Sequence, residues 1–357
     1  MENEIRKKMP IIYLNIWDEY PAPMYNREYY ESCDALFGIS KQTANINKIV
    51  LGDKAENKII KYVPHGLDNK NFRILKQEDP QVQEFKKRMT RGRDYDFVLL
   101  FNSRNIRRKS IPDTLLAWKL FTEKLPKDKA DKCLFILHTD PVSDAGTDLP
   151  AVIDYFFPND PNIVLSNVKL PSDEMNLLYN CADGVILLSS AEGWGLSLTE
   201  AMLTGTPFIA NVTGGMQDQM RFETKDGEWI EFDENFPSNH KGSVKKCGKW
   251  AFPVFPKALS IVGSPPTPYI FDTRCTPEDA AEQIMKLYKM SPKERKKIGE
   301  EGRKWATSDE AGFTSEKMSK KIIEGIDELF ETWEPRPKYE IIKDTDFESK
   351  VLKHTLL

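Results

Sequence analysis

The chain has 357 residues, of which 40% are hydrophobic and 30% are charged. This apolar share is enough to fill protein cores, which excludes wholesale disorder, and the length predicts about two domains. With 51 Lys and Arg against 55 Asp and Glu, the formal net charge is −4, so there is no basic excess to neutralise a nucleic-acid backbone. No apolar run approaches the length that spans a bilayer, and the first residues do not form a signal peptide. We therefore expect a cytoplasmic protein that does not bind nucleic acid, with peripheral attachment to a membrane left open.

Short apolar runs recur along the chain and predict β-strands. They lie at residues 11–15, 35–39, 59–63, 97–101, 133–137, 162–165, 184–188 and 207–210. Most of these runs lack polar alternation, which is typical of strands buried on both faces of a parallel sheet. Helical patterns separate them, so the sequence predicts an α/β fold.

Helix signals are clearest in the second half of the chain. Amphipathic or capped patterns cover residues 112–121, 172–181 and 316–331. Further helices are expected to begin at Thr276-Pro277 and at Ser291-Pro292, where Glu294 completes a capping box. Two stretches interrupt the pattern. Residues 219–268 show no helical stripe and predict an irregular insertion, and residues 334–357 predict a polar tail.

The segment 189–207 follows a predicted strand directly and reads SSAEGWGLSLTEAMLTGTP. Gly193 and Gly195 allow a ligand to approach the backbone, and a helix that begins near Leu196 directs free N–H groups towards the same place. Glu200 lies among apolar residues without a basic neighbour in sequence, so we expect it to face a cavity and accept hydrogen bonds from hydroxyl groups. The alternative is an ordinary solvated helix glutamate.

The segment 97–112 reads FVLLFNSRNIRRKSIP, and its cations follow another predicted strand. Arg104, Arg107, Arg108 and Lys109 would suit a diphosphate, because the carboxyl ends of parallel strands share one edge of a sheet. The alternative is a solvated basic loop. The five cysteines and four histidines lack zinc spacing, so we expect neither a metal nor a cofactor.

Several motifs together resemble the retaining glycosyltransferases of the group 1 (family four) type. They are EGWGLSLTEAM at 192–202, Gly205-Thr206-Pro207, Gly214-Gly215, the turn YVPHGLD at 62–68 with Phe72, and Ser103-Arg104 with Lys109. The resemblance implies the GT-B architecture, in which two Rossmann-like domains face each other across a cleft.

The resemblance also implies the roles of particular residues. Arg104, Lys109 and Glu192 would form the catalytic set of a hexosyl-type transferase, in which the two cations hold the donor diphosphate and the carboxylate binds sugar hydroxyls. The donor would be a nucleotide sugar. It would also contact Gly193, Trp194, Gly195, Leu196, Glu200, Val168 and Lys169. Asp18 and His65 are weaker candidates on the acceptor side. Transfer would retain the anomeric configuration and need no metal.

The sequence departs from the family pattern in two places. Ser110 stands where the family usually has Gly. The segment up to and including the interdomain turn is short, because it covers only residues 1–72, and this sets the expected domain bounds. We therefore expect a truncated Rossmann-like N-terminal portion over 1–72, a Rossmann-type C-terminal domain over 73–333 and a tail over 334–357. A companion chain or a second copy would complete the cleft, and the acceptor could be a glycan, a lipid or a protein.

Two other functions remain open on the sequence alone. The first is a non-catalytic nucleotide-sugar-binding remnant or subunit that needs a partner chain. The second is a phosphorylase or epimerase with the same fold.

Overall fold

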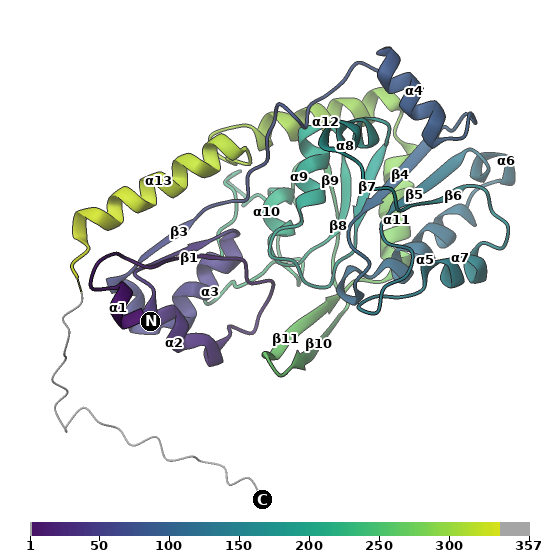
Figure 1. Ribbon diagram of the computed structural model, residues 1–357. Helices are drawn as coiled ribbons and strands as arrows, with labels where there is room; N and C mark the ends of the chain where they lie inside the picture. The colour runs from purple at the N-terminus through teal and green to yellow at the C-terminus, as the bar shows by residue number, and fades with distance from the viewer. Residues whose placement is uncertain (1, 336–357) are drawn as a thin grey trace, which may run out of the picture.

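Two parallel sheets organise the chain (Figure 1). A computed structural model describes residues 2–335. The smaller sheet has the order β1-β2-β3, with strands Ile12–Asn15, Ala35–Gly38 and Ile59–Tyr62. The larger sheet has six strands in the order β6-β5-β4-β7-β8-β9. Its strands are β4 Phe97–Asn102, β5 Cys133–His138, β6 Ile163–Ser166, β7 Gly184–Leu187, β8 Phe208–Asn211 and β9 Ala251–Val254.

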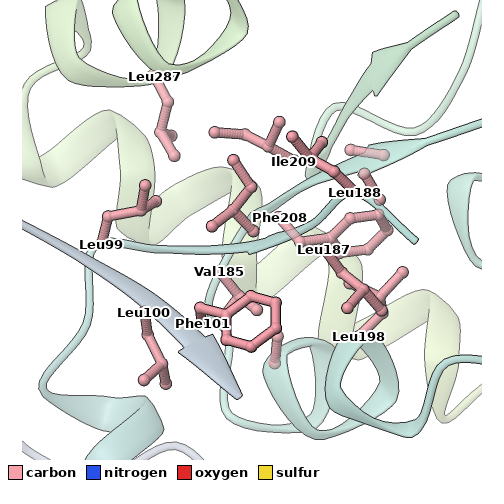
Figure 2. Packing of buried hydrophobic residues seen from close by; sticks show 14 of the residues in the cluster. Leu99, Leu100, Phe101, Val185, Leu187, Leu188, Leu198, Phe208, Ile209 and Leu287 are labelled. Atoms are coloured by element: carbon pink, nitrogen blue, oxygen red, sulfur yellow. The ribbon is translucent and has the colours of Figure 1, made fainter. Parts of the chain in front are cut away.

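The order of the larger sheet is that of a doubly wound Rossmann fold, because the chain moves outwards on one side from β4 and on the other side from β7. Every strand predicted from an apolar run is present, with ends that differ by at most one residue. Residues 97–101 are buried along their whole length and pack against both layers of helices, as the unalternated pattern predicted (Figure 2).

The helices of the described chain connect these strands. They are α1 Glu2–Ile5, α2 Arg27–Ser32, α3 Lys41–Leu51, α4 Pro80–Met89, α5 Ile111–Thr122, α6 Lys127–Ala130, α7 Leu149–Phe156, α8 Ser172–Asn180, α9 Leu196–Leu203, α10 Met216–Met220, α11 Pro277–Lys289, α12 Pro292–Ala306 and α13 Ser315–Thr332. The predicted capping box is confirmed, since Ser291 and Glu294 satisfy each other's backbone N–H groups at the start of α12. None of these helices is long and apolar enough to cross a membrane.

Helix α13 leaves the larger body and packs on the smaller sheet, as its path in Figure 1 shows. Its Leu329 lies in one apolar cluster with Ala35, Phe37 and Val63, and Met318 packs against the same cluster. Helix α13 therefore packs with the smaller sheet, although in the sequence it follows the larger sheet.

Residues 219–268 are more regular than the sequence predicted. The expectation of an irregular insertion is wrong for β9, which joins the edge of the larger sheet, and for a hairpin of β10 Ala258–Ser264 and β11 Thr267–Arg274. Pro253 lies inside β9, and an edge strand tolerates proline because one side of its backbone needs no partner. The hairpin is largely exposed, so it lacks the apolar run that marked the other strands.

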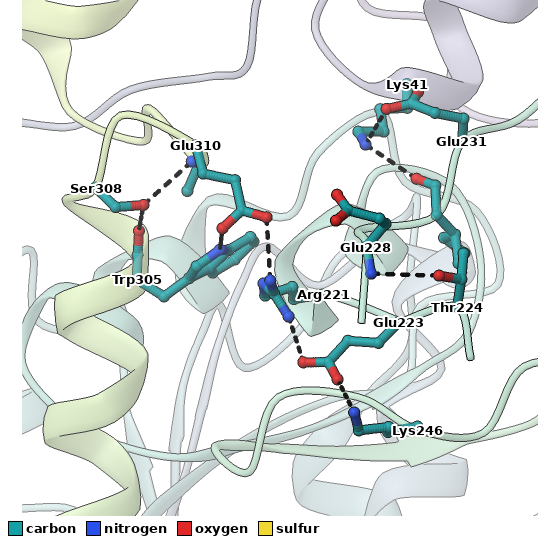
Figure 3. A network of polar contacts seen from close by, with 12 residues as sticks. Lys41, Arg221, Glu223, Thr224, Glu228, Glu231, Lys246, Trp305, Ser308 and Glu310 are labelled. Carbon is teal, nitrogen blue, oxygen red and sulfur yellow. Dashed lines mark hydrogen bonds and ion pairs between the residues drawn. The ribbon is translucent and has the colours of Figure 1, made fainter. Parts of the chain in front are cut away.

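The rest of this segment is held by ion pairs. Arg221 pairs with Glu223 and with Glu310, and Lys246 pairs with Glu223 (Figure 3). These ion pairs hold the segment against the residues that follow α12. Most of the segment therefore has a fixed conformation although it is neither helix nor strand.

A buried carboxyl group joins the two halves of the molecule. Asp218 of α10 is fully buried, and its Oδ2 accepts a hydrogen bond of 2.9 Å from the backbone N–H of Lys41 at the start of α3. Burial raises the pKa of Asp218 from 3.8 to about 7, and the contacts with Lys41 oppose this shift. The folded state therefore binds this proton more tightly than the unfolded chain does.

This pKa predicts a pH dependence of stability. Because the folded pKa is the higher one, the stabilisation is complete below the unfolded pKa and is lost as the pH rises through about 7. Between about pH 4 and pH 7, this group should lower the free energy of unfolding by up to about 1.4 kcal/mol per pH unit. Asp218→Asn should remove that slope in urea unfolding measured at several pH values. An equal slope in the variant and the parent would contradict the assignment.

Candidate functional site

A cavity of about 660 Å³ opens between the two sheets, at the carboxyl ends of β4 and β7. These strands are neighbours in the larger sheet, and the strand order reverses between them. In doubly wound sheets, the crevice at this reversal is where ligands bind. The segment after β4 carries the cluster of cations, and the segment after β7 carries the glycine-rich motif.

The structure brings the predicted site residues to this cavity, except Arg107 of the predicted basic cluster, which lines a neighbouring cavity. The walls of the cavity between the sheets include Asp18, His65, Arg104, Lys109, Val168, Lys169, Glu192, Gly193, Trp194, Gly195, Leu196 and Glu200. The smaller sheet contributes the segments that hold Asp18 and His65, and the larger sheet contributes the rest. Residues from both halves of the chain therefore surround one space.

A buried cluster of charges forms one end of the cavity. Glu192 is 5% exposed and forms ion pairs with Lys109 Nζ and, at 3.1 Å, with Arg108 Nη1. Ser189 Oγ donates a hydrogen bond of 2.9 Å to Glu192 Oε1. Burial raises the pKa of a carboxylate, but Lys109 and Arg108 outweigh burial and lower the pKa of Glu192. Glu192 is therefore an anion that holds two cations in place.

Arg104 differs from these cations because its side chain is exposed at the cavity. In the described part of the chain it forms no ion pair, so its guanidinium is available to a ligand. Ser110 completes this turn with a left-handed backbone, at φ +49° and ψ +43°. Glycine adopts that conformation without strain, which explains the residue usual in the family at this position.

The glycine-rich motif positions the start of helix α9 at the cavity. Gly195 is left-handed at φ +87°, and α9 begins at the next residue, so its first backbone N–H groups and its positive dipole end lie at the cavity. Trp194 is 3% exposed; its Nε1 donates to Thr199 Oγ1 at 2.8 Å, and its ring packs against Phe313. Its ring therefore anchors the loop, while its backbone lies at the cavity.

Gly214 and Gly215 pack against the backbone of the glycine-rich motif. The N–H of Gly215 donates to the carbonyl of Glu192 at 2.9 Å. A Cβ on Gly215 would lie 2.2 Å from the carbonyl oxygen of Gly193, and one on Gly214 would lie 1.9 Å from that of Glu192. Only glycine permits this approach of two backbones.

Substitution at Gly215 should therefore displace the motif. Gly215→Ala is expected to lower the free energy of unfolding by about 3 kcal/mol, because the added methyl group forces one backbone segment away from the other. Gly227→Ala is the control and should lower the free energy of unfolding less. No atom lies within 4 Å of a Cβ at that position, so only the φ of +87° is unfavourable. Urea unfolding measures both variants. A smaller loss for Gly215→Ala than for Gly227→Ala would contradict the packing argument.

Glu200 lies one helical turn into α9, on the side that faces the cavity. Its Oε2 accepts hydrogen bonds from Tyr179 Oη and, at 3.3 Å, from Asn102 Nδ2. Burial raises the pKa of Glu200, and these two donors oppose the shift. In the described residues Oε1 has no donor, so it is free to accept from hydroxyl groups of a ligand.

The cavity extends along the ends of β5 and β6. His138 Nδ1 lies 3.1 Å from Ser166 Oγ, and residues 167–169 continue the wall, with Val168 63% exposed. On the opposite side, burial raises the pKa of Asp18, although Arg108 counteracts it with its Nε 3.6 Å from the carboxylate.

Tyr179 and Asn102 were not predicted as site residues, and Arg108 was predicted only as one of four cations that would suit a diphosphate. Arg108 contacts both Glu192 and Asp18, and Tyr179 and Asn102 orient Glu200. The run of cations indicated Arg108, but no sequence pattern shows which of the neighbouring side chains at 107–109 contacts Glu192. Tyr179 lies within a helix, and only the fold brings it to Glu200.

Comparisons with known proteins agree with this geometry. The family model for glycosyl transferases, group 1, matches residues 163–235, which run from β6 past α10. Sucrose-phosphate synthase from Thermosynechococcus elongatus is similar in structure, with a TM-score of 0.59 and 18% identity over 86% of this chain. This chain spans 61% of that protein's length. No curated protein sequence matches the chain.

Two further structures share the fold. HepE from Anabaena, solved with UDP and glucose, has a TM-score of 0.61 at 14% identity, over 90% of this chain and 72% of that one. Trehalose 6-phosphate synthase from Burkholderia multivorans has a TM-score of 0.63 at 9% identity, over 91% and 67%. The fold is therefore that of the GT-B glycosyltransferases. The family model matches the segment that carries Glu192 and Glu200, which confirms the resemblance to group 1 glycosyltransferases predicted from the sequence.

Proposed function

We propose that the protein is a glycosyltransferase that moves a hexose from a nucleotide diphosphate donor to an acceptor hydroxyl, with retention and without a metal. The observation that carries this proposal is that Arg104, Lys109, the start of α9 and Glu200 in the same helix line one cavity. The family match over residues 163–235 and the structures solved with UDP, glucose or UDP-glucose support it.

The cations and the helix start would act on the leaving group. When the bond between the sugar and the diphosphate breaks, negative charge develops on the diphosphate oxygens. Arg104, Lys109 and the N–H groups at Leu196 and Ser197 are placed to stabilise that charge as it forms, which lowers the barrier of the chemical step. They need no reorganisation, because Glu192 holds Lys109 in position.

The carboxylates would hold the rest of the donor. Glu200 offers its free oxygen to the ribose hydroxyls, and Val168 and Lys169 lie where the base would stack at the end of β6. Glu192 first orders the two cations beside it. Its Oε1 already accepts from Lys109 and Ser189, but its Oε2 pairs with Arg108 and can accept one more hydrogen bond, so it can also orient a sugar hydroxyl.

A donor panel tests the proposal. The full chain is incubated with UDP-glucose, UDP-galactose, GDP-mannose and ADP-glucose, and release of nucleoside diphosphate and the anomer formed are followed by NMR. We expect turnover of one donor, with the new bond in the configuration of the donor. Failure of all four to be hydrolysed, transferred or bound would count against the proposal.

A second candidate function is a subunit that binds a nucleotide sugar without turning it over. The size of the smaller sheet favours it, since three strands face the six of the larger sheet in the described part of the chain. This candidate predicts binding of one donor with no release of nucleoside diphosphate until a partner chain or a second copy is added.

A further inference from the structure

A second cavity, of about 810 Å³, adjoins the donor cavity. The two cavities share Asp18 and Arg108, so they meet at the charged cluster beside Glu192. The other walls of the second cavity include the hairpin β10–β11, the loop 144–146 and the short segments 106–107 and 190–191. We call it the hairpin cavity.

The hairpin presents a different face to each side. The register pairs Val262 with Ile270 and Ser260 with Asp272, and residues paired in this way share one face. Val262, Ile270 and Asp272 line the hairpin cavity. The alternate residues Leu259 and Thr273 line a separate cavity on the opposite face, and Phe271 borders both cavities. The hairpin is thus a wall between two spaces.

Contacts from both halves of the molecule fix this wall. The N–H of Thr273 donates to the carbonyl of Ser190 at 3.0 Å, and the N–H of Phe271 donates to the carbonyl of Tyr20 at 2.7 Å. The rings of Tyr25 and Tyr269 meet edge to face at 4.8 Å between centroids. Figure 1 shows the hairpin projecting from the larger body on the side of the smaller sheet.

We propose that the hairpin cavity binds the acceptor, and that the acceptor is a carbohydrate. This inference rests on the proposed function. The carboxylates of Asp18, Asp144 and Asp272 can accept hydrogen bonds from sugar hydroxyls, and Val262 and Ile270 provide apolar contact for the C–H face of a sugar ring. Because Arg107 and Arg108 offset these charges, neither sign dominates, and the lining suits a neutral ligand rich in hydroxyl groups better than a phosphate.

Asp18 marks the point where acceptor and donor would meet. It lies on the wall of both cavities, its Oδ1 lies against Gly193, and its Oδ2 is 3.6 Å from Arg108 Nε. An acceptor hydroxyl that donates to Asp18 would therefore point towards the sugar. Its oxygen forms the new bond to the anomeric carbon as the bond to the diphosphate breaks, and its proton passes along the same hydrogen bond to the carboxylate of Asp18, so that the diphosphate departs with the electron pair of the broken bond.

Two substitutions on one strand test the inference. Val262→Trp fills the hairpin cavity, whereas Ile261→Trp places the same ring on the opposite face, where Ile261 is 65% exposed. The donor that the panel identifies is supplied with methyl glycosides of glucose, galactose and mannose, and the ratio of transfer to hydrolysis is measured. This ratio does not depend on the fraction of folded protein, because both reactions occur on the same molecules.

We expect Val262→Trp to lower the ratio by about tenfold or more, and Ile261→Trp to leave it within about twofold. Asp144→Asn, an exposed change on the far wall, should also lower it. An unchanged ratio in Val262→Trp, or an equal fall in Ile261→Trp, would overturn the inference. Donor hydrolysis without transfer to any of the glycosides would also overturn it and leave the proposed function standing. A chain that binds no donor would instead refute the proposed function.

Discussion

Replacement of Lys109 by methionine is expected to lower kcat/KM for sugar transfer by about 10²–10³-fold, which corresponds to about 3–4 kcal/mol. Lys109 is 8% exposed, so water cannot take over the charge that it places beside the diphosphate. Steady-state kinetics with the donor found in the panel measures the effect. Lys119→Met is a matched control on the neighbouring helix α5, where the lysine forms only a partly exposed pair with Glu123. A value of kcat/KM within about threefold of the parent would contradict the assignment.

The same substitution should also destabilise the fold. Removing Lys109 leaves Glu192 with Arg108 as its remaining cation, and breaking a buried ion pair costs about 3 kcal/mol. The double variant Lys109→Met with Glu192→Gln should regain most of that stability in urea unfolding, because the buried charge is removed. It should not regain activity. Recovery of activity together with stability would show that Lys109 acts through the fold alone.

Glu200→Gln is expected to weaken binding of a nucleoside diphosphate by about 10–100-fold, since hydrogen bonds to a charged group contribute about 1.5–3 kcal/mol. The amide is the same size as the carboxylate and can still accept from Tyr179, so the core around α9 should be retained. The affinity is measured by calorimetry with the tightest binder among UDP, GDP, ADP and CDP. Glu282→Gln, an exposed change on α11, is the control.

A ligand lacking the ribose hydroxyls separates this role from a structural one. With the 2′,3′-dideoxy form of the same nucleotide, the parent should lose about as much affinity as Glu200→Gln does, and the variant should lose little more. Additive losses would mean that Glu200 does not contact the ribose. Tyr179→Phe, which removes one donor to Glu200, should weaken binding less than Glu200→Gln.

The larger sheet was predictable because its strands are buried on both faces. Runs such as 97–101 and 184–188 contain almost no polar residue, and burial on both sides requires that composition. The hairpin β10–β11 was missed for the opposite reason: β10 is mostly exposed, β11 is mostly half-buried, and the two strands include Gly263 and Pro268. Strand formation there depends on pairing between its two arms and on contacts with Ser190 and Tyr20, which no local pattern reveals.

The candidate site was predictable to the extent that it follows strand ends. Arg104 and Glu192 lie in the loops that follow β4 and β7, and the topology of a parallel sheet brings those strand ends to one edge. Pairwise geometry was not predictable. The orientation of Glu200 by Tyr179 and the choice of Arg108 over Arg107 as a partner for Glu192 both depend on side-chain directions set by tertiary packing.

The central claim is that the cavity between the two sheets recognises a diphosphate attached to a nucleoside. Calorimetric titration of the full chain with UDP, GDP, ADP and CDP, and with the matching nucleosides, tests it most directly. One diphosphate should bind with a Kd of about 1–100 μM, its nucleoside should bind at least about tenfold more weakly, and Arg104→Ala should remove most of that difference. Equal affinity for nucleoside and diphosphate, or an unchanged difference in Arg104→Ala, would contradict the claim.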